Sequence, residues 1–185
     1  MDVRLASLTT LGAVAGGSGA VGVYKLVNRE DSSNSLTSEE YQLVFRKFKS
    51  EGDFIAALKT RVPNITSQST YEEGGKAAKE WCERNDSSNS KRWCLQLPKT
   101  IGEELGKPLA TNWEKQIKDI KAKNIDGLLD DLKTVNSKLP SVDENKDSQE
   151  ALRGWCKSKL DIKLISDGAD SILEKVKSRC LSNDN

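Results

Sequence analysis

The strongest constraint on the fold is an internal repeat, because the sequence aligns with itself without a gap when it is shifted by 74 residues. Between positions 37 and 82, 12 of 46 residues are identical to the residue 74 positions later. Self-similarity of this kind indicates one supersecondary unit used more than once. We therefore predict two tandem repeats. The open alternative is that shared helical patterning and abundant Lys and Thr produce the match. The best-matched segments are Leu58-Lys59-Thr60 with Leu132-Lys133-Thr134, and Trp81-Cys82 with Trp155-Cys156.

Helix start signals recur along both repeats. Thr37 and Glu40 have the spacing of a capping box, in which the hydroxyl and the carboxylate each accept a backbone N–H. Apolar residues then follow at helical spacing, and the clearest stripe runs from Ile125 to Leu139, before Pro140. Strand-type alternation has one short candidate, residues 161–165. Further expected helix starts are Thr70/Glu73, Thr100/Glu103, Thr111/Glu114 and Asp147/Glu150.

The N-terminal segment has the length of a membrane span. No charge occurs in the 20 residues from Leu5 to Tyr24, and a helix of that length spans about 30 Å, the thickness of the bilayer core. We expect an uncleaved single-pass anchor that contacts the membrane through residues 5–24. A cleaved signal peptide and a Gly-rich soluble tail remain open alternatives. Lys25 and Arg29 weakly favour a cytoplasmic body.

These signals together predict an all-α protein. Its body is a small helical bundle built from two tandem three-helix-type repeats behind an N-terminal membrane-spanning helix. The predicted divisions are an anchor at residues 1–27, a polar linker at 28–36, helical repeat 1 at 37–98 and helical repeat 2 at 99–185.

Composition excludes several classes of function. Lys and Arg number 29 against 28 Asp and Glu, which leaves no excess of positive charge to attract nucleic acid. The chain has no histidine. It therefore lacks the base of Ser-His-Asp and Cys-His catalytic sets and the commonest metal ligand. We expect no catalytic residue, no cofactor and no metal site.

The four cysteines are the strongest candidates for a structural site. Each repeat has a Trp-Cys pair followed by one more cysteine, so the repeat favours Cys82 with Cys94 and Cys156 with Cys180. Disulfides would indicate an oxidising, extracellular setting, which argues against the orientation favoured by the basic flank. Four free thiols buried in a cytosolic protein are the main alternative.

Trp81 and Trp155 occupy equivalent positions in the repeat, each directly before a cysteine. Both lie on helices whose apolar residues face a core, so we expect them to be buried repeat-core residues. A role for exposed tryptophans in stacking on a ligand is the less favoured interpretation.

Short motifs ending in Trp-Cys also carry a family resemblance. They are Ala78-Lys79-Glu80-Trp81-Cys82, Leu152-Arg153-Gly154-Trp155-Cys156 and the looser Lys91-Arg92-Trp93-Cys94. With the short Gly/Ala-rich N-terminus, they resemble a paralogous family of the haemotropic mycoplasmas, wall-less bacteria that live on red blood cells. The resemblance implies a surface-exposed membrane protein of a multigene family that serves antigenic variation. It supplies no catalytic residue.

Two functions from different classes follow as expectations. The first is a membrane-anchored, non-enzymatic surface protein that contacts a host-surface protein or serves antigenic variation. The second is an intracellular helical scaffold, tethered by the same span, with reduced thiols. An enzyme that uses Asp, Glu, Lys or Cys is the least favoured.

Overall fold

The computed structural model of the protein describes residues 36–84, 88–123 and 127–181. Every regular element within them is an α-helix, which confirms the predicted all-α class. Residues 161–165 form no strand; Lys163 makes a single isolated bridge to Thr100. The helices are α1 (Ser38–Phe48), α2 (Gly52–Lys59), α3 (Tyr71–Arg84), α4 (Ser88–Trp93), α5 (Ile101–Leu105), α6 (Trp113–Ala122), α7 (Leu128–Lys133), α8 (Lys146–Lys159) and α9 (Ala169–Cys180).

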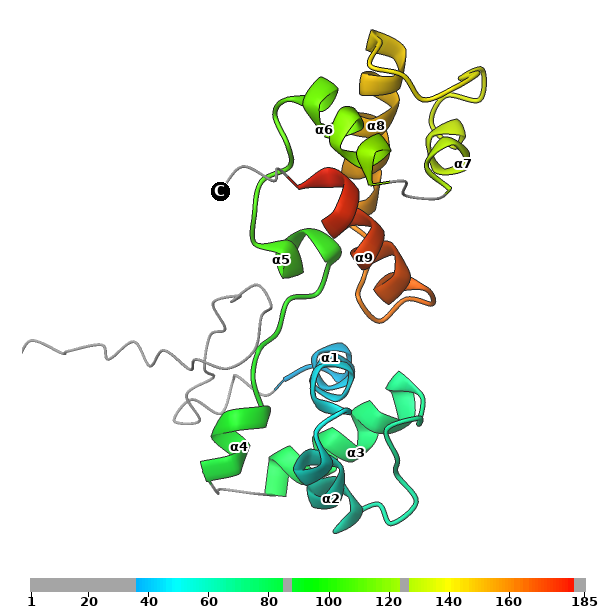
Figure 1. The fold of residues 1–185 in the computed structure, drawn as a ribbon. Helices are drawn as coiled ribbons and strands as arrows, with labels where there is room; N and C mark the ends of the chain where they lie inside the picture. The colour runs from blue at the N-terminus through cyan, green and yellow to red at the C-terminus, as the bar shows by residue number, and fades with distance from the viewer. Residues whose placement is uncertain (1–35, 85–87, 124–126, 182–185) are drawn as a thin grey trace, which may run out of the picture.

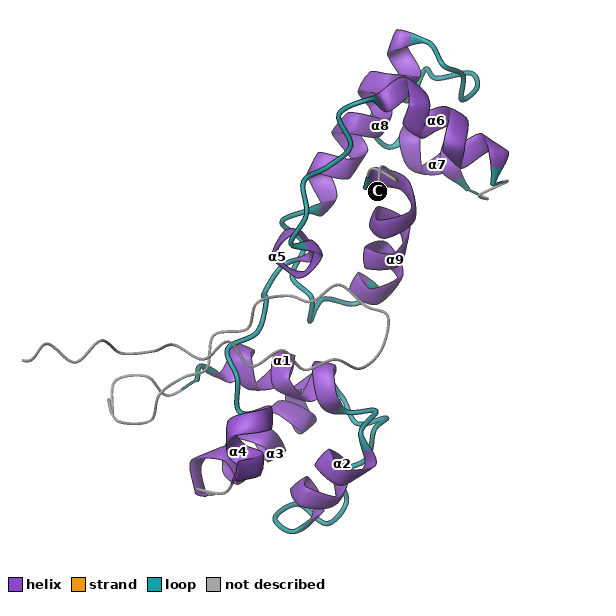
Figure 2. Ribbon diagram, turned by 60° about the vertical axis from the view of Figure 1, so that its left-hand side comes forward, coloured by secondary structure: helices purple, strands orange, loops and turns teal. Residues whose placement is uncertain are grey.

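The helices form two groups (Figure 1). We call α1–α4 the N-terminal lobe and α5–α9 the C-terminal lobe. In the first, α1 packs extensively on α3; in the second, α6, α7 and α9 pack on α8. The two lobes lie one beyond the other in both views (Figure 2) and are joined by residues 95–100, which we call the connector. The predicted boundary between residues 98 and 99 falls inside this connector.

The connector is attached to both lobes. On the N-terminal side, Glu40 of α1 accepts a hydrogen bond from Gln96 at 3.2 Å and pairs with Lys99 at 3.0 Å. On the C-terminal side, the Lys99 carbonyl accepts the Leu164 N–H at 2.9 Å. Burial raises the pKa of Glu40, but hydrogen bonds from Thr37, Lys99 and Gln96 outweigh it and lower the pKa to about 2.

Capping boxes begin the two long helices of the N-terminal lobe, as the sequence predicts. The hydroxyls of Thr37 and Thr70 each accept the N–H three residues later. The carboxylates of Glu40 and Glu73 in turn accept the N–H of the same threonines, at 2.7 and 3.0 Å. Thr100 also accepts the N–H of the residue three positions later, at 3.3 Å.

Two expected helix starts in the C-terminal lobe are wrong by one or two residues. The N-cap of α6 is Asn112 rather than Thr111, and the N-cap of α8 is Asn145 rather than Asp147. Each asparagine side chain accepts the N–H three residues later at 2.9 Å. Asparagine caps a helix as well as threonine or aspartate does, so an acidic residue three places later did not identify the N-cap.

The apolar stripe from Ile125 to Leu139 is not one helix. Residues 124–126 lie outside the described residues, and α7 ends at Lys133. Past that point Thr134 and Val135 donate to carbonyls three residues back, which tightens the chain into turns. Leu139 is nevertheless buried, at 2% exposure, so the apolar pattern marked the core rather than the helix end.

Two glycines allow the close packing of α3 on α1. A Cβ on Gly74 would lie 2.1 Å from ring atoms of Phe45, and a Cβ on Gly75 would lie 2.6 Å from Cγ of Gln42. Real Cβ atoms do not approach so closely, because packed interiors leave no such overlap. The Gly74-Gly75 pair therefore sets the separation of these two helices.

The proposed membrane span lies outside the described residues, as do the anchor at 1–27 and all of the linker except Leu36. In the described part of the chain, no helix has the length and apolar character needed to cross a bilayer.

Candidate functional site

Each lobe contains one disulfide. Cys82 of α3 is bonded to Cys94 beside α4, and Cys156 of α8 is bonded to Cys180 of α9. The Cα separations are 5.9 and 5.7 Å, within the usual range of about 4.4–6.8 Å. These are the two pairs that the repeat favours, and they leave no free cysteine. Cys94 is partly buried, whereas the other three are buried.

In the N-terminal lobe, the tryptophan before the first cysteine lies in an aromatic cluster. The Trp81 ring centroid is 5.4 Å from that of Trp93, which is 5.2 Å from the ring of Phe54. The indole N–H of Trp93 donates to Glu51 at 3.1 Å, and Arg92 pairs with the same carboxylate at 2.7 Å. The aromatic rings thus pack against one another, while the indole N–H of Trp93 bonds to a charged partner.

In the C-terminal lobe, the equivalent tryptophan packs against a cation. The Arg179 guanidinium lies 5.4 Å from the ring centroid of Trp155. Both residues are buried, each at 1% exposure. Arg179 pairs with Asp131 of α7, to which Lys175 also binds at 2.8 Å. Burial raises the pKa of Asp131, but hydrogen bonds from Lys175 and Arg179 lower it below its ordinary value.

Both tryptophans are buried, as predicted from the sequence, whereas the burial of Arg179 was not predicted. The position of Arg179 in the sequence could have indicated its burial, because Arg179 directly precedes Cys180 as Trp93 directly precedes Cys94. Aligning the second cysteines would place the two side chains at equivalent positions. The structure brings each one against the tryptophan of its own lobe.

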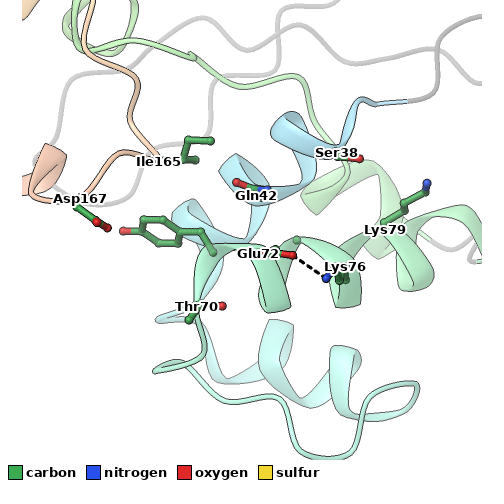
Figure 3. Close-up of a pocket in the computed structure, with 10 residues that line it drawn as sticks. Ser38, Gln42, Thr70, Glu72, Lys76, Lys79, Ile165 and Asp167 are labelled. Carbon is green, nitrogen blue, oxygen red and sulfur yellow. Dashed lines mark hydrogen bonds and ion pairs between the residues drawn. The ribbon is translucent and has the colours of Figure 1, made fainter.

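A cleft of about 510 Å³, with a mixed polar and apolar lining, lies where the two lobes meet. It is formed by α1, by α3 and by residues 165–167 just before α9 (Figure 3). Its position was not predicted, because its walls come from both lobes. The lining residues are Ser38, Gln42, Thr70, Tyr71, Glu72, Gly75, Lys76, Lys79, Ile165 and Asp167.

Asp170 of α9 links the C-terminal lobe to the wall of this cleft. Its carboxylate accepts two hydrogen bonds from Arg46 of α1, at 3.0 and 2.6 Å, and one from the Tyr71 hydroxyl at 3.0 Å. We call Arg46, Tyr71 and Asp170 the Asp170 clasp. Burial and the bond to Asp170 raise the pKa of Tyr71. Burial raises the pKa of Asp170, but the hydrogen bonds and the charge of Arg46 outweigh this effect. The pKa therefore lies below its ordinary value, and this carboxyl stays ionised.

The charges along the cleft are nearly balanced. Lys76 pairs with Glu72 at 2.8 Å, and Lys79 pairs with Glu83 at 3.9 Å. In contrast, the side chains of Gln42 and Asp167 make no hydrogen bond or ion pair within the described part of the protein. The cleft therefore presents one amide and one carboxylate with unused bonding capacity.

No protein family, curated protein or solved structure matches the chain. Within the described ranges, no three His, Cys, Asp or Glu side chains gather in a way that could hold a metal ion.

Proposed function

We propose that this protein is a non-enzymatic, membrane-anchored surface protein whose helical body lies outside the cell, where it contacts a host surface or serves antigenic variation. The observation that carries the proposal is that all four cysteines are paired in two disulfides. Such bonds persist in oxidising, extracellular compartments and are rare where thiols are kept reduced. The absence of histidine from the chain supports a role other than acid–base catalysis.

The anchor in this proposal is the uncharged segment of residues 5–24. The basic flank at Lys25 and Arg29 opposes an external body, but two charges give only a weak orientation signal. The disulfides favour the external side more strongly. The Trp-Cys motifs that resemble the surface-protein family of haemotropic mycoplasmas support the same location.

We further propose that the lobes are two copies of one ancestral unit. Helices α1, α2 and α3 correspond in order to α6, α7 and α8, and each copy ends with a disulfide to the next helical segment. Eight buried apolar positions recur 74 residues later. They are Leu43/Ile117, Phe54/Leu128, Leu58/Leu132, Ile65/Leu139, Ala77/Ala151, Ala78/Leu152, Trp81/Trp155 and Cys82/Cys156.

Protease treatment of intact cells tests the location. We expect proteinase K added outside to remove the signal of an antibody raised against the C-terminal lobe, while a cytosolic protein in the same cells survives. Lysed cells serve as the control that the lobe is digestible. Full protection of the lobe in intact cells, with digestion after lysis, would contradict the surface proposal and favour the intracellular scaffold.

A further inference from the structure

We propose that the cleft between α1, α3 and residues 165–167 binds a neutral, hydroxyl-rich ligand of the carbohydrate class. This inference deepens the proposed surface function and rests on it, because a sugar chain on a host cell is reachable only from outside. The shape, bonding capacity and charge of the cleft support this ligand class.

Size and position are those of a ligand site. A volume of about 510 Å³ falls within the range of about 300–1,000 Å³ that is common for small-molecule pockets, which form preferentially where domains meet. The walls come from the two lobes, and Figure 3 shows Ile165 and Asp167 on a segment separate from the helices that carry Gln42 and Lys76. A bound chain would thus touch both lobes.

Unused polar groups in the cleft match hydroxyl groups. The Gln42 amide can donate and accept, and the Asp167 carboxylate only accepts. Neither has a partner within the described part of the protein; Gln42 is half-buried, whereas Asp167 is exposed at the rim. A sugar hydroxyl donates one hydrogen bond and accepts others, so one ligand class satisfies both groups. Ser38 adds a hydroxyl at the edge of the same cleft.

Charge and the small number of large apolar side chains argue against other ligand classes. Lys76 and Lys79 are each paired with a glutamate one helical turn away, so the cleft has no surplus positive charge for an acidic ligand. A peptide ligand is anchored by apolar or aromatic side chains in apolar pockets. Here the large apolar side chains of the lining are Ile165 and the ring of Tyr71.

The packing around the cleft holds its floor and one wall in position. Gly75 lies under Gln42, and a side chain at position 75 would come within 2.6 Å of Gln42 Cγ and displace the amide. The Asp170 clasp fixes the Tyr71 hydroxyl, since Asp170 is held in turn by Arg46. The site is therefore largely formed before a ligand binds.

The test uses the full-length protein, with both disulfides intact, on an array of neutral oligosaccharides. Sialylated and sulfated oligosaccharides and unmodified peptides are the comparison classes. We expect binding to neutral oligosaccharides. Hydrogen bonds to charged groups contribute more affinity than those to neutral groups, so we expect Asp167→Asn, which removes the charge, to weaken binding about tenfold and Gln42→Ala, which removes a neutral amide, to weaken it about fivefold.

Two exposed residues outside the cleft give matched controls, Asp161→Asn and Gln68→Ala, which should bind as the unmodified protein does. Unchanged thermal unfolding shows that each variant is folded. The proposal is overturned if no neutral oligosaccharide binds, if binding is confined to acidic sugars or peptides, or if the two cleft variants bind normally. These outcomes leave the protease result on intact cells unaffected, so failure of the sugar site is distinguishable from failure of the surface location.

Discussion

The two lobes differ in what packs against the tryptophan that precedes their first cysteine. Each has a helix that carries Trp-Cys, and in each the residue before the second cysteine packs against that tryptophan. In the N-terminal lobe this residue is Trp93, and the contact is part of an aromatic cluster. In the C-terminal lobe it is Arg179, whose charge is balanced by Asp131 of α7.

The difference teaches that a disulfide and a tryptophan can keep one local geometry while the neighbouring core changes from apolar to ionic. The two cores should respond differently to substitution. Apolar clusters lose stability in proportion to the area and volume removed. A buried ion pair contributes little net stability, yet removing one partner is costly because the other charge stays buried.

The largest effect is expected from breaking the ionic core. Asp131→Ala leaves Arg179 buried without that carboxylate and should lower the free energy of unfolding by about 3–5 kcal/mol. Denaturant unfolding measures this. The neighbouring Asp130 is exposed, and its side chain makes no hydrogen bond or ion pair in the described part of the chain, so Asp130→Ala is the matched control and should change little.

Replacing the whole pair sharpens the same comparison. If Arg179 is costly only when unpaired, Asp131→Leu combined with Arg179→Met should recover most of the loss, because apolar residues of similar volume often substitute well for a buried ion pair. A double variant as unstable as Asp131→Ala would show that the C-terminal lobe needs the charges themselves.

Removing each disulfide should cost slightly less than breaking the ion pair. The bonds close loops with sequence separations of 12 and 24 residues, for which chain entropy gives about 3 and about 3.5 kcal/mol. Paired Cys→Ala variants of each lobe, compared by thermal unfolding, measure these values.

Mild reductant should open Cys82–Cys94 first, because Cys94 is only partly buried. Earlier reduction of Cys156–Cys180, detected by timed alkylation, would contradict this order.

Acid should affect the N-terminal lobe through Glu40. Its pKa falls from 4.5 in the unfolded chain to about 2 in the folded protein. The stabilisation is therefore present above about pH 4.5 and is lost as the pH falls toward 2; linkage makes it about 3 kcal/mol. Glu40→Gln should lower stability at pH 7, with the deficit shrinking over that range. Glu114→Gln, 74 residues later and exposed, is the control and should leave the free energy of unfolding at pH 7 nearly unchanged.

The smallest effect is expected at the glycine contact. Gly74→Ala gains helix propensity but drives its Cβ into the Phe45 ring, so we expect a net loss of about 1–2 kcal/mol in unfolding free energy. At the position 74 residues later, the C-terminal lobe already has a buried side chain, Ser148. Gly52→Ala, where a Cβ meets open space, should not destabilise the protein. Equal behaviour of the two alanine variants would refute the close-packing account.

Local signals in the sequence were enough to predict the helical class, the capping boxes at Thr37 and Thr70, and the cysteine pairing. Each depends on residues close in sequence or related by the repeat. The end of α7 was not predictable in this way, because Leu139 is buried without being helical. Apolar spacing reports which residues reach the core, and turns can deliver them there as well as a helix can.

The ionic core and the cleft depend on tertiary contacts. An arginine in the last turn of a helix normally suggests a solvent-exposed charge that complements the helix dipole. Arg179 is instead buried, since α7 brings Asp131 to it from 48 residues away. The cleft is formed where α1 and α3 meet residues 165–167, and no spacing rule joins segments so distant.

The most direct test of the account is the state of the cysteines in the native protein. Cells are treated with an alkylating reagent before lysis, and tryptic peptides are mapped by mass spectrometry without reduction. We predict that the peptide Glu80–Arg84 is linked to Trp93–Lys99, that Gly154–Lys157 is linked to the peptide beginning at Cys180, and that no cysteine is alkylated. Alkylation of all four cysteines, or links that join one lobe to the other, would contradict the two-lobe, extracellular account.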